Sequence, residues 1–306
     1  MHGWIIIDKP LGLGSTQVVS AVKRALRQGG YGKFKVGHGG TLDPLATGVL
    51  PVAVGEATKL AGRMLDSDKV YAFTIRFGAQ TDTLDAEGPV IATSDVRPTA
   101  AQVAAVLPRF TGPIAQVPPA YSALKVDGER AYDLARAGEE VVLASRNVTI
   151  HSLAPAPAPS GPEGEVQEAT LTAHVSKGTY IRSLARDIAL ALGTVGHVTM
   201  LRRLKAGPFD LAPAISLDKL AEAGMARTLE HLLLPLRAGL DDIPALPLSP
   251  DQAGALRQGR VLTGIAADDG QYFACEGDTP IALVEVEAEE ARVVRGFNVS
   301  MSRTEP

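Results

Sequence analysis

Asp43 is the residue of this sequence best placed for acid–base or nucleophilic chemistry. It follows the glycine-rich segment 37–40 and precedes Pro44. Glycine lets the backbone pass close to other atoms and proline fixes φ, so the carboxylate is predicted to stand on a rigid loop, which suits a catalytic group. A lone Leu-Asp-Pro equally fits an aspartate that only caps a turn. The tripeptide by itself leaves the role of Asp43 open.

Three further side chains could share a site with Asp43. Arg182 stands near the start of an amphipathic helix, on a face away from its apolar positions, where it can pair with a carboxylate or a phosphate. Tyr71 opens a strand with an apolar face, so it is either a core residue or a surface on which a base can stack. His38 is either a polar loop residue or a substrate contact.

Other catalytic sets are not found in the sequence. The six histidines are scattered without ligand spacing and Cys275 is the single cysteine, so neither a metal site nor a disulfide is predicted. The sequence holds no P-loop, dinucleotide fingerprint or nucleophile elbow. It also holds no run of about 20 apolar residues and no secretory-signal pattern, so we expect a cytoplasmic protein without a membrane partner.

Charge is unevenly distributed along the chain, although the net charge is only −4. Residues 1–40 hold six basic side chains against one acidic, and residues 176–210 hold six against two. Residues 241–297 hold four basic against eleven acidic side chains. The two basic clusters are compatible with a nucleic-acid-binding face, and a solvated surface is the alternative.

Periodicity predicts the elements that must position these residues. Ser15 is a plausible N-cap for the first helix, and Thr99 can cap a later one. Strands are expected over 3–7, 70–77, 168–175 and 198–204, and helices over 15–27, 100–107 and 179–192. The proline-rich stretch 154–165 is expected to be an exposed connection. Prolines at 244, 247 and 250 indicate a linker to a small β-rich domain.

Long stretches of the chain, in this order, resemble the TruB-type tRNA pseudouridine synthases. They are DKPLGLGS (8–15), KVGHGGTLDPLATGVLPVAVGEATKL (35–60), DSDKVYAFTIRFGAQTDTLDAEG (66–88), PPAYSALKVDGERAYDLAR (118–136), SKGTYIRSLARDIALALG (176–193) and MLRRLKAGPF (200–209). The C-terminal part resembles the PUA-like domain of the same family. The resemblance covers the chain nearly end to end, apart from the proline-rich insertion and parts of 211–240.

The resemblance implies an α+β fold with two domains. Residues 1–240 would form a pseudouridine synthase domain on a long mixed, mostly antiparallel sheet with a central RNA cleft. An inserted region at about 119–145 would grip the T-arm of tRNA. Residues 241–306 would form the PUA-like RNA-binding domain.

The implied activity is the isomerisation of uridine-55 in the T-loop of tRNA, after the base is flipped out of its loop. This reaction involves no redox change or energy input, so no cofactor is expected, and no metal or obligatory protein partner is inferred. The alternative is a tRNA-binding or folding module in which catalysis is secondary.

The resemblance also carries roles onto individual residues. Catalysis falls on Asp43, Tyr71 and Arg182, with Arg182 pairing with Asp43. The uridine pocket would be lined by His38, Tyr71, Tyr180 and Leu201. The RNA backbone would be bound by Lys9, Lys23, Lys33, Lys35, Arg202 and Arg203. Gly39 departs from the family pattern, which has threonine at this position.

Overall fold

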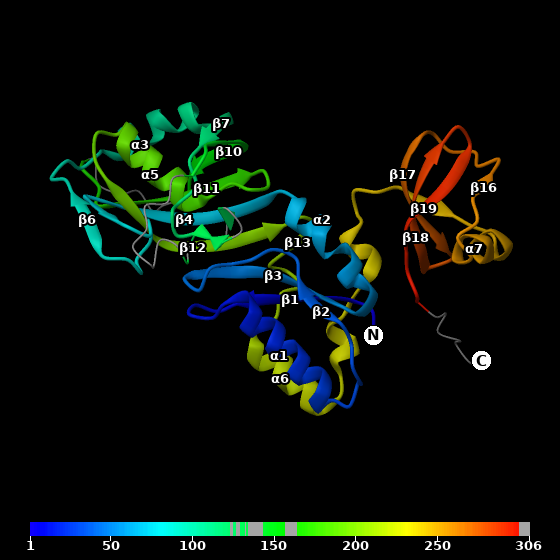
Figure 1. Cartoon of the computed structure of the whole chain (residues 1–306). Coiled ribbons are helices and arrows are strands. Elements are labelled where there is room, and N and C mark those ends of the chain that lie inside the picture. The colour runs from blue at the N-terminus through cyan, green and yellow to red at the C-terminus, as the bar shows by residue number, and fades with distance from the viewer. Residues whose placement is uncertain (123–124, 127–128, 132, 134–142, 157–163, 300–306) are drawn as a thin grey trace.

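A ten-stranded sheet runs through the first 240 residues of the computed structural model (Figure 1). The structure describes residues 1–122, 125–126, 129–131, 133, 143–156 and 164–299. The main path of the sheet has the order β14-β1-β3-β12-β4-β11-β10-β7, with β2 beside β3 and β13 beside β12. Its strands are β1 (Gly3–Lys9), β2 (Val36–His38), β3 (Ala46–Val54), β4 (Lys69–Phe77), β7 (Gly112–Gln116), β10 (Arg146–Pro155), β11 (Glu168–Val175), β12 (Gly196–Ala206), β13 (Phe209–Asp210) and β14 (Leu234–Pro235).

Within these described strands, β3 and β12 are parallel and the other pairings are antiparallel, which confirms the predicted mixed sheet. The helices of this part are α1 (Ser15–Gln28), α2 (Ala61–Asp66), α3 (Ala100–Val106), α5 (Ile181–Ala191) and α6 (Leu217–Ala226), with 3-10 turns η1 (Gly55–Leu60), η2 (Leu107–Phe110), η3 (Leu229–Leu232) and η4 (Leu236–Gly239). Two short hairpins complete it, β5 (Ala79–Thr81) with β6 (Val90–Thr93) and β8 (Lys125–Val126) with β9 (Glu129–Arg130).

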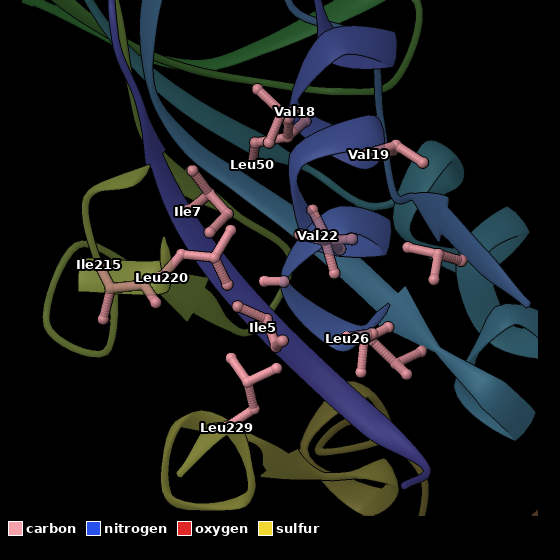
Figure 2. Packing of buried hydrophobic residues seen from close by; sticks show 14 of the residues in the cluster. Ile5, Ile7, Val18, Val19, Val22, Leu26, Leu50, Ile215, Leu220 and Leu229 are labelled. Carbon is pink, nitrogen blue, oxygen red and sulfur yellow. The ribbon is translucent and has the colours of Figure 1, made fainter. Parts of the chain in front are cut away.

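Two apolar clusters share one face of the sheet. Figure 2 shows the first, where α1, β1, β3 and α6 pack together around side chains such as Ile5 and Val22. The second joins β4 and β11 to α3 and α5 around Phe73. Tyr71 and Leu201 contact both clusters, so they lie where the two halves of the sheet meet. Tyr71 is partly buried on the core face of β4, as the alternation along this strand predicts.

Two sequence expectations at element ends have different outcomes. Thr99 caps α3 as predicted, because its hydroxyl accepts a hydrogen bond from Gln102 N. The stretch expected to be an exposed connection is exposed at its start, but it is a strand there, since β10 continues to Pro155, which pairs with Leu171. β7 pairs with β10 only over Arg146–Ile150, so no strand on that side needs the N–H that Pro155 lacks. Residues 157–163 lie outside the described chain.

The C-terminal part forms its own five-stranded sheet, separate from the first in Figure 1. Its elements are β15 (Ala245–Pro247), α7 (Pro250–Arg257), β16 (Leu262–Thr263), β17 (Gly270–Glu276), β18 (Thr279–Glu287) and β19 (Glu290–Gly296). Phe273, Leu283 and Phe297 pack with Trp4 in one buried cluster, which joins this sheet to β1. Among the described helices, none has the length and apolar character required to cross a membrane.

Candidate active site

The loop that carries Asp43 connects β2 to β3 and is held on both sides of the aspartate. Before it, the Ser15 hydroxyl accepts a hydrogen bond from Leu42 N at 2.8 Å and donates to Leu42 O at 3.1 Å. After it, Pro44 O accepts a hydrogen bond from Gly12 N at 2.8 Å, and Asp43 O accepts one from Ala46 N. Because the neighbouring peptides are fixed, the Asp43 side chain has a defined origin, as the glycine and proline pattern predicts.

Ser15 is not the N-cap of α1 that its sequence position predicts. Gly14 is the N-cap of α1, and the residue that reaches back to its N–H is Gln17, whose side-chain oxygen accepts that hydrogen bond. The Ser15 hydroxyl is buried and is used by Leu42 instead. The start of α1 is thus attached directly to the Asp43 loop.

Arg203 and Lys9 are buried, which contradicts their assignment to the RNA backbone. The Arg203 side chain, in a residue only 1% exposed, donates to the carbonyl oxygens of Gly40, Thr41 and Val49. Lys9 is fully buried and its Nζ donates to the carbonyl oxygens of Pro10, Leu13 and Pro44. Both cations are used inside the protein to hold backbone carbonyls near Asp43, so they cannot reach a phosphate in this structure.

Burial also lowers the pKa of Lys9 to about 8. An unfolded lysine has a pKa of about 10.4, so between these values the unfolded chain binds more protons than the folded one. Stability linked to Lys9 must therefore rise with pH across that window.

We expect Lys9→Met to flatten the pH dependence of stability between about pH 8 and about pH 10. The rise in the free energy of unfolding across this window should be smaller than in the unmodified chain by about 1 kcal/mol or more, because the titrating group is gone. Urea unfolding of both proteins at the two pH values measures the difference. Equal rises in both proteins would contradict the prediction. Lys69, whose pKa is also lowered to about 8, is present in both proteins, so its contribution cancels in the comparison.

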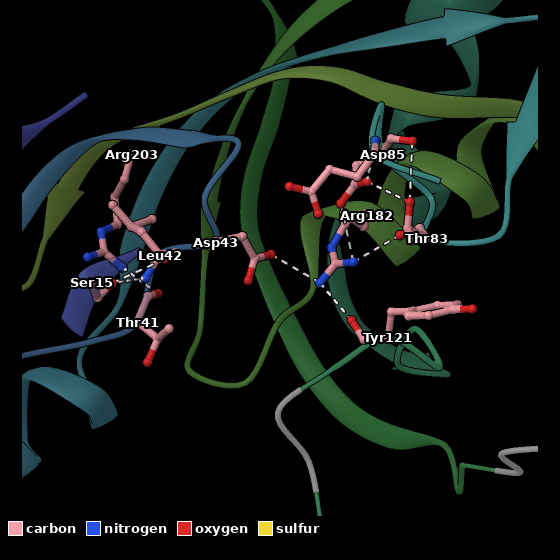
Figure 3. Close-up of polar contacts among 10 residues, drawn as sticks. Ser15, Thr41, Leu42, Asp43, Thr83, Asp85, Tyr121, Arg182 and Arg203 are labelled. Atoms are coloured by element: carbon pink, nitrogen blue, oxygen red, sulfur yellow. Dashed lines mark hydrogen bonds and ion pairs between the residues drawn. The ribbon is translucent and has the colours of Figure 1, made fainter. Parts of the chain in front are cut away.

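Arg182 lies between two carboxylates, as Figure 3 shows. Its Nη2 is 3.0 Å from Asp43 Oδ2, and its Nη1 is 3.4 Å from Asp85 Oδ2. The guanidinium also donates to Thr83 O at 2.9 Å and to Tyr121 O at 3.0 Å. The side chains of Arg182 and Asp85 are 9% and 10% exposed, whereas that of Asp43 is 47% exposed. Arg182 is held by Asp85, Thr83 O and Tyr121 O, and Asp43 is the member of the group that faces solvent.

Asp85 is the residue of this group that sequence reasoning missed. Its Oδ1 accepts hydrogen bonds from Thr83 Oγ1 at 2.6 Å and Glu87 N at 3.0 Å, which leaves Oδ2 for Arg182. It lies in the matching stretch 66–88, but the contact with Arg182 spans two distant segments. No local pattern reveals such a contact.

The pocket in front of Asp43 has a volume of about 190 Å³. It is lined by Thr41, Leu42, Asp43, Ala46, Tyr71, Ser122, Thr179, Tyr180, Ile181, Arg182 and Leu201. The structure thus brings together five of the residues predicted for the site, Asp43, Tyr71, Tyr180, Arg182 and Leu201, from four separate segments of the chain. The aromatic and apolar walls of this pocket can hold a flat ring, and the exposed carboxylate can act on a bond at the edge of that ring.

His38 is outside this lining. It lies on β2, opposite Val52 of β3, and is half-buried. Burial and the nearby Arg203 guanidinium lower the pKa of His38, so the neutral imidazole is favoured. Its predicted contact with the substrate is therefore not reproduced by the pocket in this structure.

The remaining predicted phosphate ligands differ in their surroundings. Lys23, Lys33 and Lys35 are exposed on and after α1. Arg202 forms a two-bonded ion pair with Asp8, at 3.0 and 2.8 Å. The three lysines stay available for an anionic ligand, whereas Arg202 would have to share its charge.

Gly39 is packed against Met64, which leaves no space for a side chain at this position. A Cβ on this residue would lie 2.6 Å from Met64 Cβ and 2.9 Å from Met64 Cγ. Met64 belongs to α2 and is buried. The space for a larger residue at 39 is occupied by Met64, so the two positions are coupled.

We expect Gly39→Thr to lower the free energy of unfolding by about 1–3 kcal/mol, because the new side chain overlaps Met64. Combining it with Met64→Gly, which removes both Cβ and Cγ of residue 64, should cost less than the sum of the two single changes, because the atoms that overlap the new side chain are then absent. Urea unfolding of the four proteins of this cycle gives the coupling. Additive effects would contradict the steric explanation.

Comparisons with known proteins identify the family of the chain. The profile of the TruB family pseudouridylate synthase N-terminal domain matches residues 23–181, and that of the tRNA pseudouridylate synthase B C-terminal domain matches residues 182–241. The chain is 69% identical to tRNA pseudouridine synthase B of Novosphingobium aromaticivorans, over 98% of both chains. It is 61% identical to the protein of the same name from Zymomonas mobilis subsp. mobilis, over 97% of this chain and 96% of that one.

Solved structures show the same fold. The chain superposes with a TM-score of 0.70 on a chain of a Cbf5–Nop10–Gar1 complex, at 25% identity and over 97% of this chain and 84% of the other. A chain of an H/ACA RNP bound to a substrate RNA gives the same TM-score at 22% identity, over 96% of this chain and 84% of that one. With relatives this similar along nearly its whole length, the chain belongs to the TruB family of pseudouridylate synthases.

Proposed function

We propose that this chain converts uridine-55 in the T-loop of tRNA to pseudouridine, in the cytoplasm and without a cofactor. The single observation that supports it best is the exposed Asp43 carboxylate, fixed against buried Arg182 in a pocket walled by Tyr71 and Leu201. The name tRNA pseudouridine synthase B, shared by the relatives from Novosphingobium aromaticivorans and Zymomonas mobilis subsp. mobilis, supports tRNA as the substrate.

The reaction breaks the bond between ribose C1′ and uracil N1, turns the base and forms a bond between C1′ and C5. The C5 proton is lost and N1 gains one, so the product is an isomer of the substrate. Asp43 starts the reaction, either as a nucleophile or by removing a ribose proton. Both routes need a carboxylate held at a fixed distance from the sugar, which the contacts of the loop and of Arg182 provide.

The target base must first leave its loop, at a cost of a few kcal/mol. We propose that the Tyr71 ring stacks on the flipped uracil and assists removal of the C5 proton, while Tyr180 and Leu201 close the pocket. Stacking on an aromatic ring repays part of the unstacking cost.

RNA binding outside the pocket is assigned to three regions. Lys23, Lys33 and Lys35 would bind phosphates, because they are exposed and have the right charge. Residues 119–145 would grip the T-arm, although many of them lie outside the described chain. Residues 241–306 would act as a PUA-like RNA-binding domain.

The test is tritium release from tRNA that carries tritium at carbon 5 of uridine, with no cofactor added. The matched substrate is the same tRNA with cytidine in place of uridine-55. We expect release from the first tRNA and none above background from the second. If both tRNAs bind and neither releases tritium, the chain is a tRNA-binding module and the proposal is wrong. Equal release from both would place the reaction at another uridine.

A further inference from the structure

Three side chains with metal-binding chemistry meet on the sheet face opposite the pocket. Asp68 precedes β4, His151 lies on β10 and His174 lies on β11. In the register of β11 with β4, Ala173 is opposite Tyr71 and His174 is opposite Val70, so His174 points away from the pocket face. The neighbour of His151, Ile150, is buried in the cluster around Phe73, so His151 points away from that cluster too.

The nitrogen atoms of both histidines approach the same carboxylate oxygen. His151 Nε2 is 3.0 Å from Asp68 Oδ2, and His174 Nε2 is 3.7 Å from it. The two rings have centroids 4.7 Å apart and an interplanar angle of 47°. Ligand atoms from all three residues lie within 4.8 Å of one another. Spacing along the chain predicted no metal-ligand set, but antiparallel pairing of β10 with β11 creates one.

These separations suit a small divalent ion. Ligands at about 2.0–2.1 Å from zinc in tetrahedral geometry are about 3.3 Å apart. The distances from Asp68 Oδ2 to His151 Nε2 and to His174 Nε2 lie on either side of that value. Imidazole nitrogen with one carboxylate oxygen is a donor set for zinc and its late first-row neighbours. The three side chains are between 37 and 47% exposed, which leaves room for water at a fourth position.

The charges around the three residues favour a cation. Asp68 borders a cavity of about 450 Å³ whose other charged lining residues are Arg63, Asp66, Asp241 and Asp242, so carboxylates outnumber cations around it. The neighbouring cations already have partners. Arg63 is 2.9 Å from Asp242 and Lys177 is 3.1 Å from Asp66.

Lys69, next to Asp68 in the chain, also points elsewhere. Its ammonium donates to the carbonyl oxygens of Met64 and Leu65 at 2.8 Å. Neither it nor the paired arginine and lysine supplies a positive charge between the histidines and Asp68.

We propose that Asp68, His151 and His174 bind one Zn²⁺ ion, or a similar late first-row divalent ion. The ion would link the segment before β4 to β10 and β11 from the side of the sheet that does not carry the pocket. Its role is structural, since Asp43 and Arg182 lie on the other face. The inference is independent of the proposed function.

Calorimetric titration of the metal-free full chain with Zn²⁺ tests this site. We expect one ion to bind per chain, and the affinity to fall by at least about 100-fold in His174→Ala and in His151→Ala, because each loses a direct ligand. His231→Ala is the matched control, since His231 is an exposed histidine of η3 outside the cluster. Zinc should also raise the thermal unfolding midpoint of the unmodified chain and the control, and not of the two ligand variants.

His174→Gln, which keeps a polar side chain of similar size, guards against a folding defect in the alanine variants. The circular dichroism spectrum and the zinc-free unfolding midpoint of His174→Gln should match those of the unmodified chain. No zinc binding by the unmodified chain overturns the proposal. Undiminished binding by His174→Ala and His174→Gln would assign the ion to other residues and overturn it as well.

Discussion

Replacing Asp43 by Asn is expected to lower kcat for tritium release by at least about 10³-fold while the Kd for tRNA stays nearly unchanged. The amide has the size of the carboxylate but can neither attack carbon nor accept a ribose proton. The rest of the pocket should persist, because Arg182 keeps its contacts with Asp85, Thr83 O and Tyr121 O. Single-turnover tritium release, with tRNA binding measured separately, distinguishes loss of chemistry from loss of binding.

Asp218→Asn is the matched control for this change. Asp218 is an exposed aspartate in the first turn of α6, outside the pocket that contains Asp43. The Asp218→Asn substitution removes one negative charge, as Asp43→Asn does, and should leave kcat unaltered. Turnover by Asp43→Asn at a rate close to that of the control would remove Asp43 from the chemistry and, with it, the proposed mechanism.

The parts of the fold that follow from local patterns were predictable from the sequence. β4 was visible because apolar residues alternate from Tyr71 to Phe77, and α5 because its apolar residues recur at helical spacing. The N-cap at Thr99 was also predictable, because it depends on a contact between residues only three positions apart. Asp43 was found as a candidate from its glycine and proline neighbours, but only the family resemblance made it specific.

The parts that depend on contacts between distant segments were not predictable in this way. Lys9 and Arg203 are basic residues in basic clusters, and nothing in their neighbours indicates that buried backbone carbonyls take up their hydrogen bonds. The role of Ser15 depends on Leu42, and the role of Asp85 depends on Arg182. The pair of His151 and His174 depends on strand register, which shifts between Ile150 and Ser152. Such contacts follow from the folded arrangement and not from spacing along the chain.

Replacing Arg182 by Lys should lower kcat by about 100-fold with a smaller change in the Kd for tRNA. The guanidinium uses one terminal nitrogen for Asp43 and Tyr121 O and the other for Asp85 and Thr83 O. A lysine keeps the positive charge but has a single nitrogen on a flexible stem, so it cannot hold both carboxylates in the same geometry. Asp43 would then sample positions from which the sugar is out of reach.

Arg186→Lys makes the same exchange one helical turn further along α5, where Arg186 pairs with Asp187 and donates to Val117 O. That control should keep kcat, because Arg186 does not line the pocket. The decisive readout is the split between kcat and Kd, since a loss of fold would weaken tRNA binding and lower the thermal midpoint together. If Arg182→Lys retains kcat at the level of Arg186→Lys, positive charge alone is sufficient at this position. The two-sided geometry of the guanidinium would then have no part in holding Asp43 for the reaction.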